Sequence, residues 1–165
     1  MTKEFISAGP YEIPVEKNAK GTKLVTRDLA REFFEFDEGL GRGRGCYIFA
    51  IRNRGLRAVY VGKATKSFQQ EVFTADKLQK LNEALHAWTH GTPVVYFIVA
   101  PARLSADTIA ETERYLIQIA KRAWPDMLNI HHSGAPDWEI RGVTSSHPGT
   151  KSDAAADLIS MLKLS

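Results

Sequence analysis

Two tyrosines in neighbouring apolar runs are the first residues in the chain that could do chemistry. Tyr47 lies in a run from Cys46 to Ile51, and Tyr60 lies in a run from Ala58 to Val61. Both runs are rich in β-branched and aromatic residues, and the bend between them carries an Asn and a Gly. This pattern predicts an antiparallel hairpin that brings the two phenols near each other.

Side chains alternate along a strand, which assigns each tyrosine to one face of the hairpin. Tyr47 should share its face with Phe49, and Tyr60 should share its face with Ala58 and Gly62. Because glycine has no side chain, the backbone at Gly62 can approach a ligand closely. The alternative is a pair of tyrosines packed in an ordinary core.

Glu113 is the carboxylate whose position most needs an explanation. A helix is predicted over 105–123, with Ser105 as its cap, and Glu113 falls within the apolar stripe of that helix. Burying an unpaired carboxylate is costly, so Glu113 must be paired, bind a metal ion, or lie at the mouth of a cleft. Either a structural salt bridge to an arginine or a catalytic or metal-binding role would satisfy it. The apolar stripe consists of Ile109, Leu116, Ile117, Ala120 and Ala123.

Positive charge is concentrated around the predicted hairpin. No Asp or Glu occurs from Gly41 to Gln70, whereas an acidic segment containing Glu32 and Glu35 comes just before it. Such a basic block is typical of a surface that binds a phosphate backbone, although arginines also keep an exposed turn soluble. Its members that flank or follow the two strands are Arg52, Arg54, Arg57, Lys63 and Lys66.

The remaining elements are expected to surround this hairpin. Residues 94–100 form a continuous apolar run, which predicts the central strand of the sheet. Pro10 and Pro14 restrict the segment between them to a short edge strand. Further expectations are a helix over 26–36, a loop over 37–45, a helical region reaching about residue 90 with a break near Thr74, a short strand or anchor over 137–140, and a helix over 152–164.

Length and composition fit one domain with a full hydrophobic core. The chain has 165 residues, 44% of them hydrophobic and 25% charged, and a formal net charge of +3. No apolar run approaches the length of a membrane span, so no membrane partner is expected. The single cysteine, Cys46, can form no disulfide within the chain and is expected to be a small buried apolar residue. A reducing, cytoplasmic location follows as the default.

The order of these motifs resembles the GIY-YIG endonuclease family. The matching residues are Gly45-Cys46-Tyr47, then Tyr60-Val61-Gly62 followed by Lys63-Ala64, then Glu113 on a later helix, and Asn129 beyond it. The resemblance implies an α+β fold with a three-stranded antiparallel sheet flanked by helices. It divides a single domain, residues 1–165, into a nuclease-like core over 45–129, an N-terminal extension over 1–44 and a C-terminal extension over 130–165.

The resemblance also implies a chemistry, the hydrolysis of phosphodiester bonds in DNA with Mg²⁺ or Mn²⁺. Tyr47 and Tyr60 would orient or deprotonate the attacking water, and Glu113 would hold the metal ion. Gly45 and Gly62 would be structural, and Asn129 would tie the last core helix to the sheet. A separate DNA-targeting protein or a homodimer is a plausible addition, because a core this small offers little binding surface.

One departure from the family pattern bears directly on catalysis. The family places an arginine on the helix after the Gly, where this chain has Gln70, and no arginine lies between Arg57 and Arg103. Losing one transition-state donor commonly costs a factor of about 100 to 1,000 in rate. Lys77 could replace the arginine, since an unbroken helix would place it on nearly the same face as Gln70, although a lysine lacks the arginine's bidentate fork.

Three hypotheses follow for the function. The first is a divergent nuclease, whose metal-dependent DNA cleavage the substitutions Glu113→Ala and Tyr47→Phe would abolish. The second is a catalytically inactive module that binds nucleic acid or a protein partner through the basic hairpin, with salt-sensitive DNA binding and no cleavage. The third is a structural domain of a larger assembly, which would neither bind nor cleave DNA.

Overall fold

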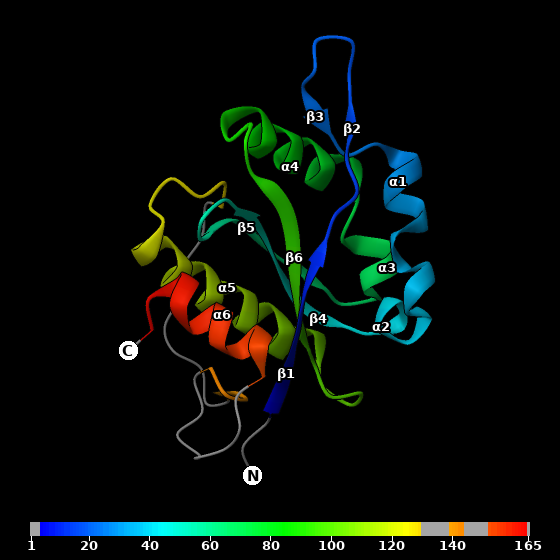
Figure 1. Ribbon diagram of the computed structural model, residues 1–165. Coiled ribbons are helices and arrows are strands. Elements are labelled where there is room, and N and C mark those ends of the chain that lie inside the picture. Colours follow the sequence, from blue (N-terminus) through cyan, green and yellow to red (C-terminus); the bar gives the residue numbers. More distant parts are fainter. Residues whose placement is uncertain (1–3, 130–138, 144–151, 165) are drawn as a thin grey trace.

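The computed structural model describes residues 4–129, 139–143 and 152–164. Its centre is a sheet with the strand order β5-β4-β6-β1-β7, and helices cover both faces (Figure 1). The strands are β1 (Glu4–Glu12), β4 (Gly45–Arg52), β5 (Leu56–Ala64), β6 (Thr92–Val99) and β7 (Glu139–Ile140), with β2 (Glu16–Lys17) and β3 (Lys23–Leu24) forming a separate small ribbon. The helices are α1 (Arg27–Glu32), α2 (Glu38–Arg42), α3 (Phe68–Glu71), α4 (Ala75–Ala87), α5 (Ala106–Ala123) and α6 (Asp153–Leu162), and a 3-10 turn spans Phe33–Phe36.

The sheet has four antiparallel strands, so the expectation of three is wrong. The fourth is β1, which pairs along β6 from Ile6 opposite Val99 to Glu12 opposite Val94. A shift of register between Ala8 and Tyr11 accommodates Pro10, which cannot donate to the ladder, and so a strand much longer than the predicted edge segment can form there. The short strand β7 adds a parallel pairing to the far side of β1.

The predicted hairpin is confirmed as the pair β4 and β5. Tyr47 and Phe49 pack into the core on one face, as alternation requires. Tyr60 does not share a face with Ala58, because the register shifts between Phe49 and Ala50 and leaves an extra residue, Val59, in β5. This bulge places Val59 and Tyr60 together on the Tyr47 face and leaves Ala58 on the other.

Two hydrophobic cores lie on opposite faces of the sheet. Helices α1 to α4 cover the core that contains both motif tyrosines, and α5 and α6 cover the other (Figure 1). The predicted break in the helical region after the hairpin is confirmed, since α3 ends before Thr74 and α4 begins immediately after it. The expected loop over 37–45 is instead partly helical, because the Asp37 side chain accepts a hydrogen bond from the Leu40 N–H and caps α2.

Helix α5 presents its predicted stripe to the second core. All five stripe residues are buried, and the Ser105 side chain caps the helix by accepting from the Thr108 N–H at 3.2 Å. The amphipathic helix α6 packs beside α5, and the Trp124 indole N–H donates to the Met161 carbonyl at 2.9 Å. Of the expected strand over 137–140, residues 137 and 138 lie outside the described part of the chain. In that described part, no helix has the length and apolar character needed to cross a bilayer.

Candidate active site on the edge strand

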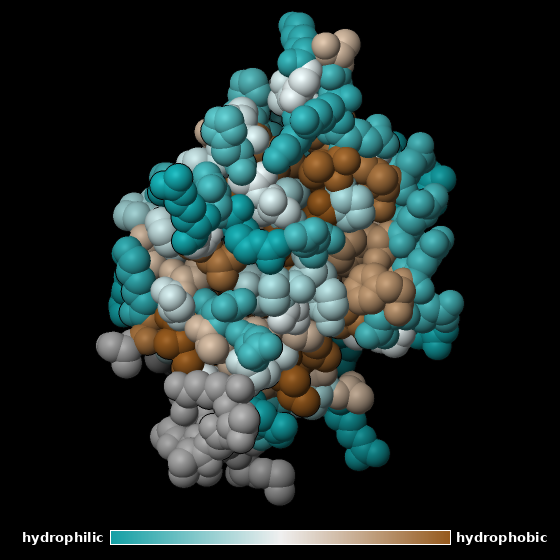
Figure 2. Space-filling view, in the orientation of Figure 1, coloured by the Kyte–Doolittle hydropathy of each residue, from teal (hydrophilic) through white to brown (hydrophobic). Residues whose placement is uncertain are grey.

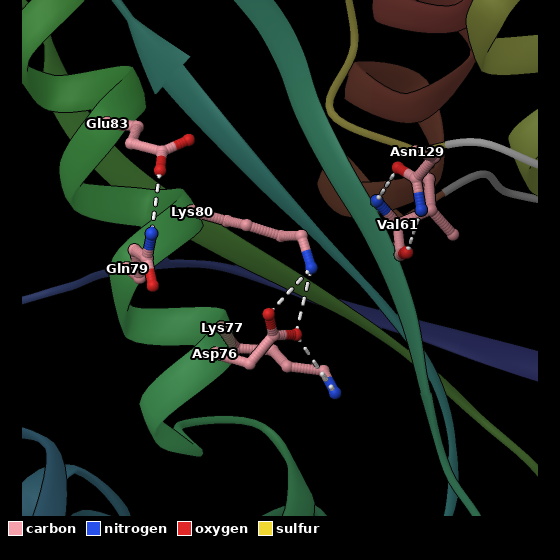
Figure 3. Close-up of polar contacts among 7 residues, drawn as sticks. All are labelled: Val61, Asp76, Lys77, Gln79, Lys80, Glu83 and Asn129. Carbon is pink, nitrogen blue, oxygen red and sulfur yellow. Dashed lines mark hydrogen bonds and ion pairs between the residues drawn. The ribbon is translucent and has the colours of Figure 1, made fainter.

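Strand β5 forms one edge of the sheet and carries four of the predicted site residues, Arg57, Tyr60, Gly62 and Lys63. Its outer side is tied to the segment after α5, because the Asn129 amide accepts from the Val61 N–H at 2.8 Å and donates to the Val61 carbonyl at 2.6 Å. Asn129 is only 8% exposed, and the Leu128 N–H adds a bond to the Val59 carbonyl at 3.1 Å. Figure 3 shows the Asn129 amide turned toward the backbone of Val61. Asn129 thus mimics a strand at this point and fixes the β5 backbone between Tyr60 and Gly62.

Tyr47 and Gly62 lie directly opposite each other in the hairpin. A Cβ added at Gly62 would overlap Cζ and the hydroxyl oxygen of Tyr47, so only glycine leaves room for this ring. Tyr47 is fully buried, and its hydroxyl has no hydrogen-bond partner among the described residues. Burial is the main cause that raises its pKa well above the usual tyrosine value, and the nearby Tyr60 and Glu113 raise it further.

Tyr60 is the more accessible of the two phenols. Its ring centroid lies 6.3 Å from that of Tyr47, and 8% of the residue is exposed. Desolvation raises the pKa of Tyr60 to about 12, with the negative charges of Glu113 and Asp76 adding to the effect. Tyr60 is therefore protonated at neutral pH and can donate a hydrogen bond.

Glu113 meets Lys63 at the edge of β5. The carboxylate oxygen Oε2 accepts from the Lys63 ammonium at 2.8 Å, and the side chains of Glu113 and Lys63 are 16% and 41% exposed, respectively. Of the alternatives open for Glu113, a salt bridge is present, but its partner is a lysine and not an arginine. Glu113 belongs to α5, on the face opposite the tyrosines, yet its charge raises the pKa of Tyr47 and Tyr60. Because β5 is an edge strand, groups from both faces can meet around it.

Lys80, which was not among the predicted site residues, lies close to Tyr60. The Lys80 ammonium lies 5.3 Å from the Tyr60 ring centroid and 2.8 Å from an Asp76 carboxylate oxygen. The expected substitute, Lys77, lies 3.8 Å from the same carboxylate. Figure 3 shows both lysines turned toward Asp76, with the Lys80 stem directed toward the strand that carries Val61. Lys80 follows Lys77 by about one helical turn, but its approach to Tyr60 depends on how α4 packs against the sheet.

The break between α3 and α4 explains why Gln70 and Lys77 do not lie on one helical face, as an unbroken helix would place them. Gln70 belongs to α3 and Lys77 to α4, so the two positions are not on one continuous helical face. Gln70 is exposed, and its backbone N–H donates to the Ser67 hydroxyl at 3.2 Å. Glu71 was not among the predicted site residues. Its carboxylate accepts from the Lys66 N–H at 2.6 Å, and its charge contributes to the raised pKa of Tyr47.

Two arginines of the predicted basic surface are engaged within the protein. Arg52 is ion-paired with Glu12. Arg57 is held by both carboxylate oxygens of Asp126, at 3.0 and 2.9 Å, and its guanidinium lies over two tryptophan rings, 4.7 Å from the Trp88 centroid and 4.6 Å from the Trp124 centroid. These two residues therefore stabilise the hairpin end.

The other predicted contact residues are available to a ligand. Arg54 is exposed at the hairpin turn with a positive φ of 59°, and Lys66 is exposed on the loop after β5. Lys63 is partly exposed despite its ion pair. Gly45 has a structural role, because its φ is 147° and an added Cβ would overlap the Ile98 carbonyl oxygen of β6.

The donor set suits only a weakly coordinated metal ion. Among the described residues, no three or more His, Cys, Asp or Glu side chains gather closely enough to enclose a metal. A closed zinc site therefore does not fit these residues. Mg²⁺ often keeps several waters and binds through one or two carboxylates together with substrate phosphates, and Glu113 could supply such a carboxylate.

Comparisons with protein-family models, with curated proteins and with solved structures find no match to this chain.

Proposed function

We propose that this protein is a metal-dependent nuclease that hydrolyses phosphodiester bonds in DNA. The observation that carries the proposal is the Lys63–Glu113 pair, which lies beside the edge strand β5 and close enough to the tyrosines for Glu113 to raise the pKa of both. A largely buried carboxylate beside a partly exposed ammonium and a protonated phenol combines a metal ligand, a phosphate-binding cation and a hydrogen-bond donor.

Tyr60 and Tyr47 take different roles in this proposal. Tyr60 contacts the substrate or the attacking water and orients it by donating a hydrogen bond, because its raised pKa keeps it protonated at neutral pH. Tyr47 is fully buried and acts as a positioning residue, since its ring fills the space above Gly62 and supports Tyr60.

Lysines supply the positive charge that the missing arginine would provide. Lys63 lies next to Glu113, and its partly exposed side chain can contact a phosphate oxygen. Lys80 approaches Tyr60 from α4 and adds a second cation on the opposite face of β5. Neither lysine offers the planar fork of arginine, so we expect slow cleavage. Mg²⁺ held by Glu113 would neutralise developing negative charge on the phosphate.

Cleavage of supercoiled plasmid in Mg²⁺ or Mn²⁺, with EDTA as the blank, tests the proposal. The informative variant is Glu113→Gln, which keeps the side-chain shape and removes the charge. We expect it to lower the cleavage rate by a factor of about 100 or more, as loss of a transition-state contact does elsewhere. The matched control is Glu111→Gln, the same change on the exposed side of the same helix, which should leave the rate unchanged.

Loss of folding is not expected to account for a lower cleavage rate in Glu113→Gln. Lys63 is 41% exposed, so water can solvate its ammonium when the partner charge is removed, and Glu113→Gln should fold because the amide keeps the shape and hydrogen-bonding capacity of the side chain. Equal activity in the two variants would refute the nuclease proposal, because the cleavage would then come from elsewhere on the protein or from a contaminant.

One observation favours a second candidate, a DNA-binding module without catalysis. Lys63 already neutralises Glu113, and this pair could be a structural element of an inactive site. The distinguishing measurement is the fluorescence anisotropy of a labelled DNA duplex in EDTA. Salt-sensitive binding that weakens in the double variant Arg54→Ala/Lys66→Ala, together with no cleavage in Mg²⁺, would support this candidate over the nuclease.

A further inference from the structure

A groove of about 470 Å³ opens between β1 and α1, on the face of the sheet covered by α1 to α4. Its apolar floor contains Tyr11, Leu29, Phe33 and Phe36, and Pro10 and Pro14 form part of its wall. Figure 2 shows hydrophobic surface gathered in this region beside α1, with hydrophilic side chains around it. The acidic segment noted in the sequence lies along this groove, and the proposed nuclease function does not use it.

Phe36 is a large apolar side chain that the fold leaves exposed to solvent. It is 57% exposed, and among the described residues the only other exposed large hydrophobic side chain is Ile6, at 52%. The Phe36 ring is held in place by Tyr11 and Phe33, with centroid distances of 5.1 and 5.6 Å. An exposed aromatic side chain held in place within the lining of a preformed groove is typical of a protein interaction site.

Negative charge borders the same groove. Glu32 and Glu35 line it, both are exposed, and neither has an ion-pair partner among the described residues. Asp37 is close enough to raise the pKa of Tyr11, although burial of the phenol is the larger cause. The groove therefore repels nucleic acid and attracts a positively charged partner.

We infer that this groove binds an extended segment of a partner protein in which basic residues alternate with proline. Aromatic-lined grooves take up proline-rich segments because the polyproline conformation is already ordered before binding. Glu32 and Glu35 would pair with the basic side chains, while the Tyr11 and Phe36 rings would contact the proline rings. This inference goes beyond the nuclease proposal and does not depend on it, since the groove contains none of the site residues on β5.

Binding of three labelled synthetic peptides of equal length, measured by fluorescence anisotropy, tests the inference. The first peptide alternates Arg and Pro, the second alternates Glu and Pro, and the third alternates Arg and Gly. We expect the Arg-Pro peptide to bind and the Glu-Pro peptide not to bind. The Arg-Gly peptide should bind about tenfold more weakly than Arg-Pro, the equivalent of about 1.4 kcal/mol.

Matched substitutions locate the binding. Phe36→Ser should weaken the Arg-Pro peptide about tenfold, whereas Ile6→Ser, the same change at the other exposed apolar residue, should have no effect. Glu35→Lys should weaken binding and reduce its salt dependence, and the control is Glu83→Lys, an equal charge change on the exposed side of α4. All four residues have exposed side chains, so their replacement should be tolerated by the fold.

Two results would overturn the inference. The Arg-Pro peptide could fail to bind at concentrations up to about 1 mM, which corresponds to an affinity too weak for recognition. Alternatively, both arginine peptides could bind with equal affinity, and Phe36→Ser could leave that affinity unchanged. The attraction would then be only electrostatic, and the groove would not be the binding site.

Discussion

Replacing Gly62 by alanine is the sharpest test of how the two tyrosine strands fit together. The added methyl group would overlap Cζ and the hydroxyl oxygen of Tyr47, and even Cε1 would be only 2.8 Å away. Tyr47 cannot turn aside, because its ring is fully buried and in contact with Phe49 and Tyr60 at centroid distances of 5.2 and 6.3 Å. The clash must therefore be relieved by moving the strands apart.

The size of the effect follows from two opposing contributions. Forcing extra atoms into a packed core costs about 1–3 kcal/mol, and an overlap with several atoms of one rigid ring belongs at the upper end of that range. Alanine also restricts the unfolded chain, which returns about 0.4–1 kcal/mol, since Gly62 does not have a positive φ. We expect a net loss of about 2–3 kcal/mol in the free energy of unfolding, or a Tm lower by about 5–10 °C.

Urea unfolding of four proteins separates the clash from other effects of the substitution. The set consists of wild type, Gly62→Ala, Tyr47→Leu and the double variant. Because Tyr47→Leu removes the ring, the alanine methyl group gains room, and the double variant should be more stable than the two single losses predict by about 2 kcal/mol. The control is Gly55→Ala, where an added Cβ meets nothing within 4 Å and stability should change by less than about 0.5 kcal/mol.

Either of two outcomes would show that the Tyr47 ring does not clash with a side chain at position 62. One is a Gly62→Ala protein as stable as wild type. The other is an equal loss from Gly62→Ala with and without the Tyr47 ring, which would mean that the ring does not occupy the space above the glycine.

Three further predictions concern the same edge of the sheet. Tyr47→Phe should leave stability unchanged or raise it by up to about 1 kcal/mol, because the hydroxyl lost has no partner among the described residues; a clear loss in urea unfolding would contradict this. Asn129→Leu should cost about 2–4 kcal/mol, since the Val61 N–H and carbonyl both lose their partner, and unchanged thermal stability would argue against the paired bonds. The Tyr60 pKa of about 12 lies above the usual value near 10, so its contribution to stability is complete below pH 10 and is lost as the pH rises from about 10 through 12. Tyr60→Phe should therefore flatten the alkaline part of a plot of unfolding free energy against pH, and a decline as steep as that of wild type would oppose the assignment.

Local pattern was a good guide to most of the fold. The hairpin, the central strand β6, the helix break near Thr74 and the buried stripe of α5 all follow from residues close together in the chain. The errors arose where a distant partner decided the outcome. The strand β1 extends through Pro10 because β6 supplies a ladder on one side, and a bulge that is visible only in the pairing register separates Tyr60 from Ala58.

The site was predictable in its residue types but less so in its pairings. An acidic residue within an apolar helical stripe correctly predicted that Glu113 would need a partner, yet Lys63 is separated from it by 50 positions. Arg52 and Arg57 belonged to the predicted basic surface, and each is instead engaged by an acidic residue far away in the sequence. A pattern of charges predicts that salt bridges form but not which ones, because the partners are chosen by the packing of helices on the sheet.

The sequence alone determined that two phenols stand on neighbouring strands beside a glycine and that a carboxylate on a later helix cannot be left unpaired. These follow from alternation along strands, helical periodicity and the cost of burying charge, which act over a few residues. The tertiary structure alone decided that β5 is an edge strand. At an edge, groups from the two faces of a sheet can meet, and that is how the charge of Glu113 comes to raise the pKa of Tyr60. The packing of α4 on the sheet, which the sequence does not reveal, brings Lys80 to 5.3 Å from the Tyr60 ring centroid.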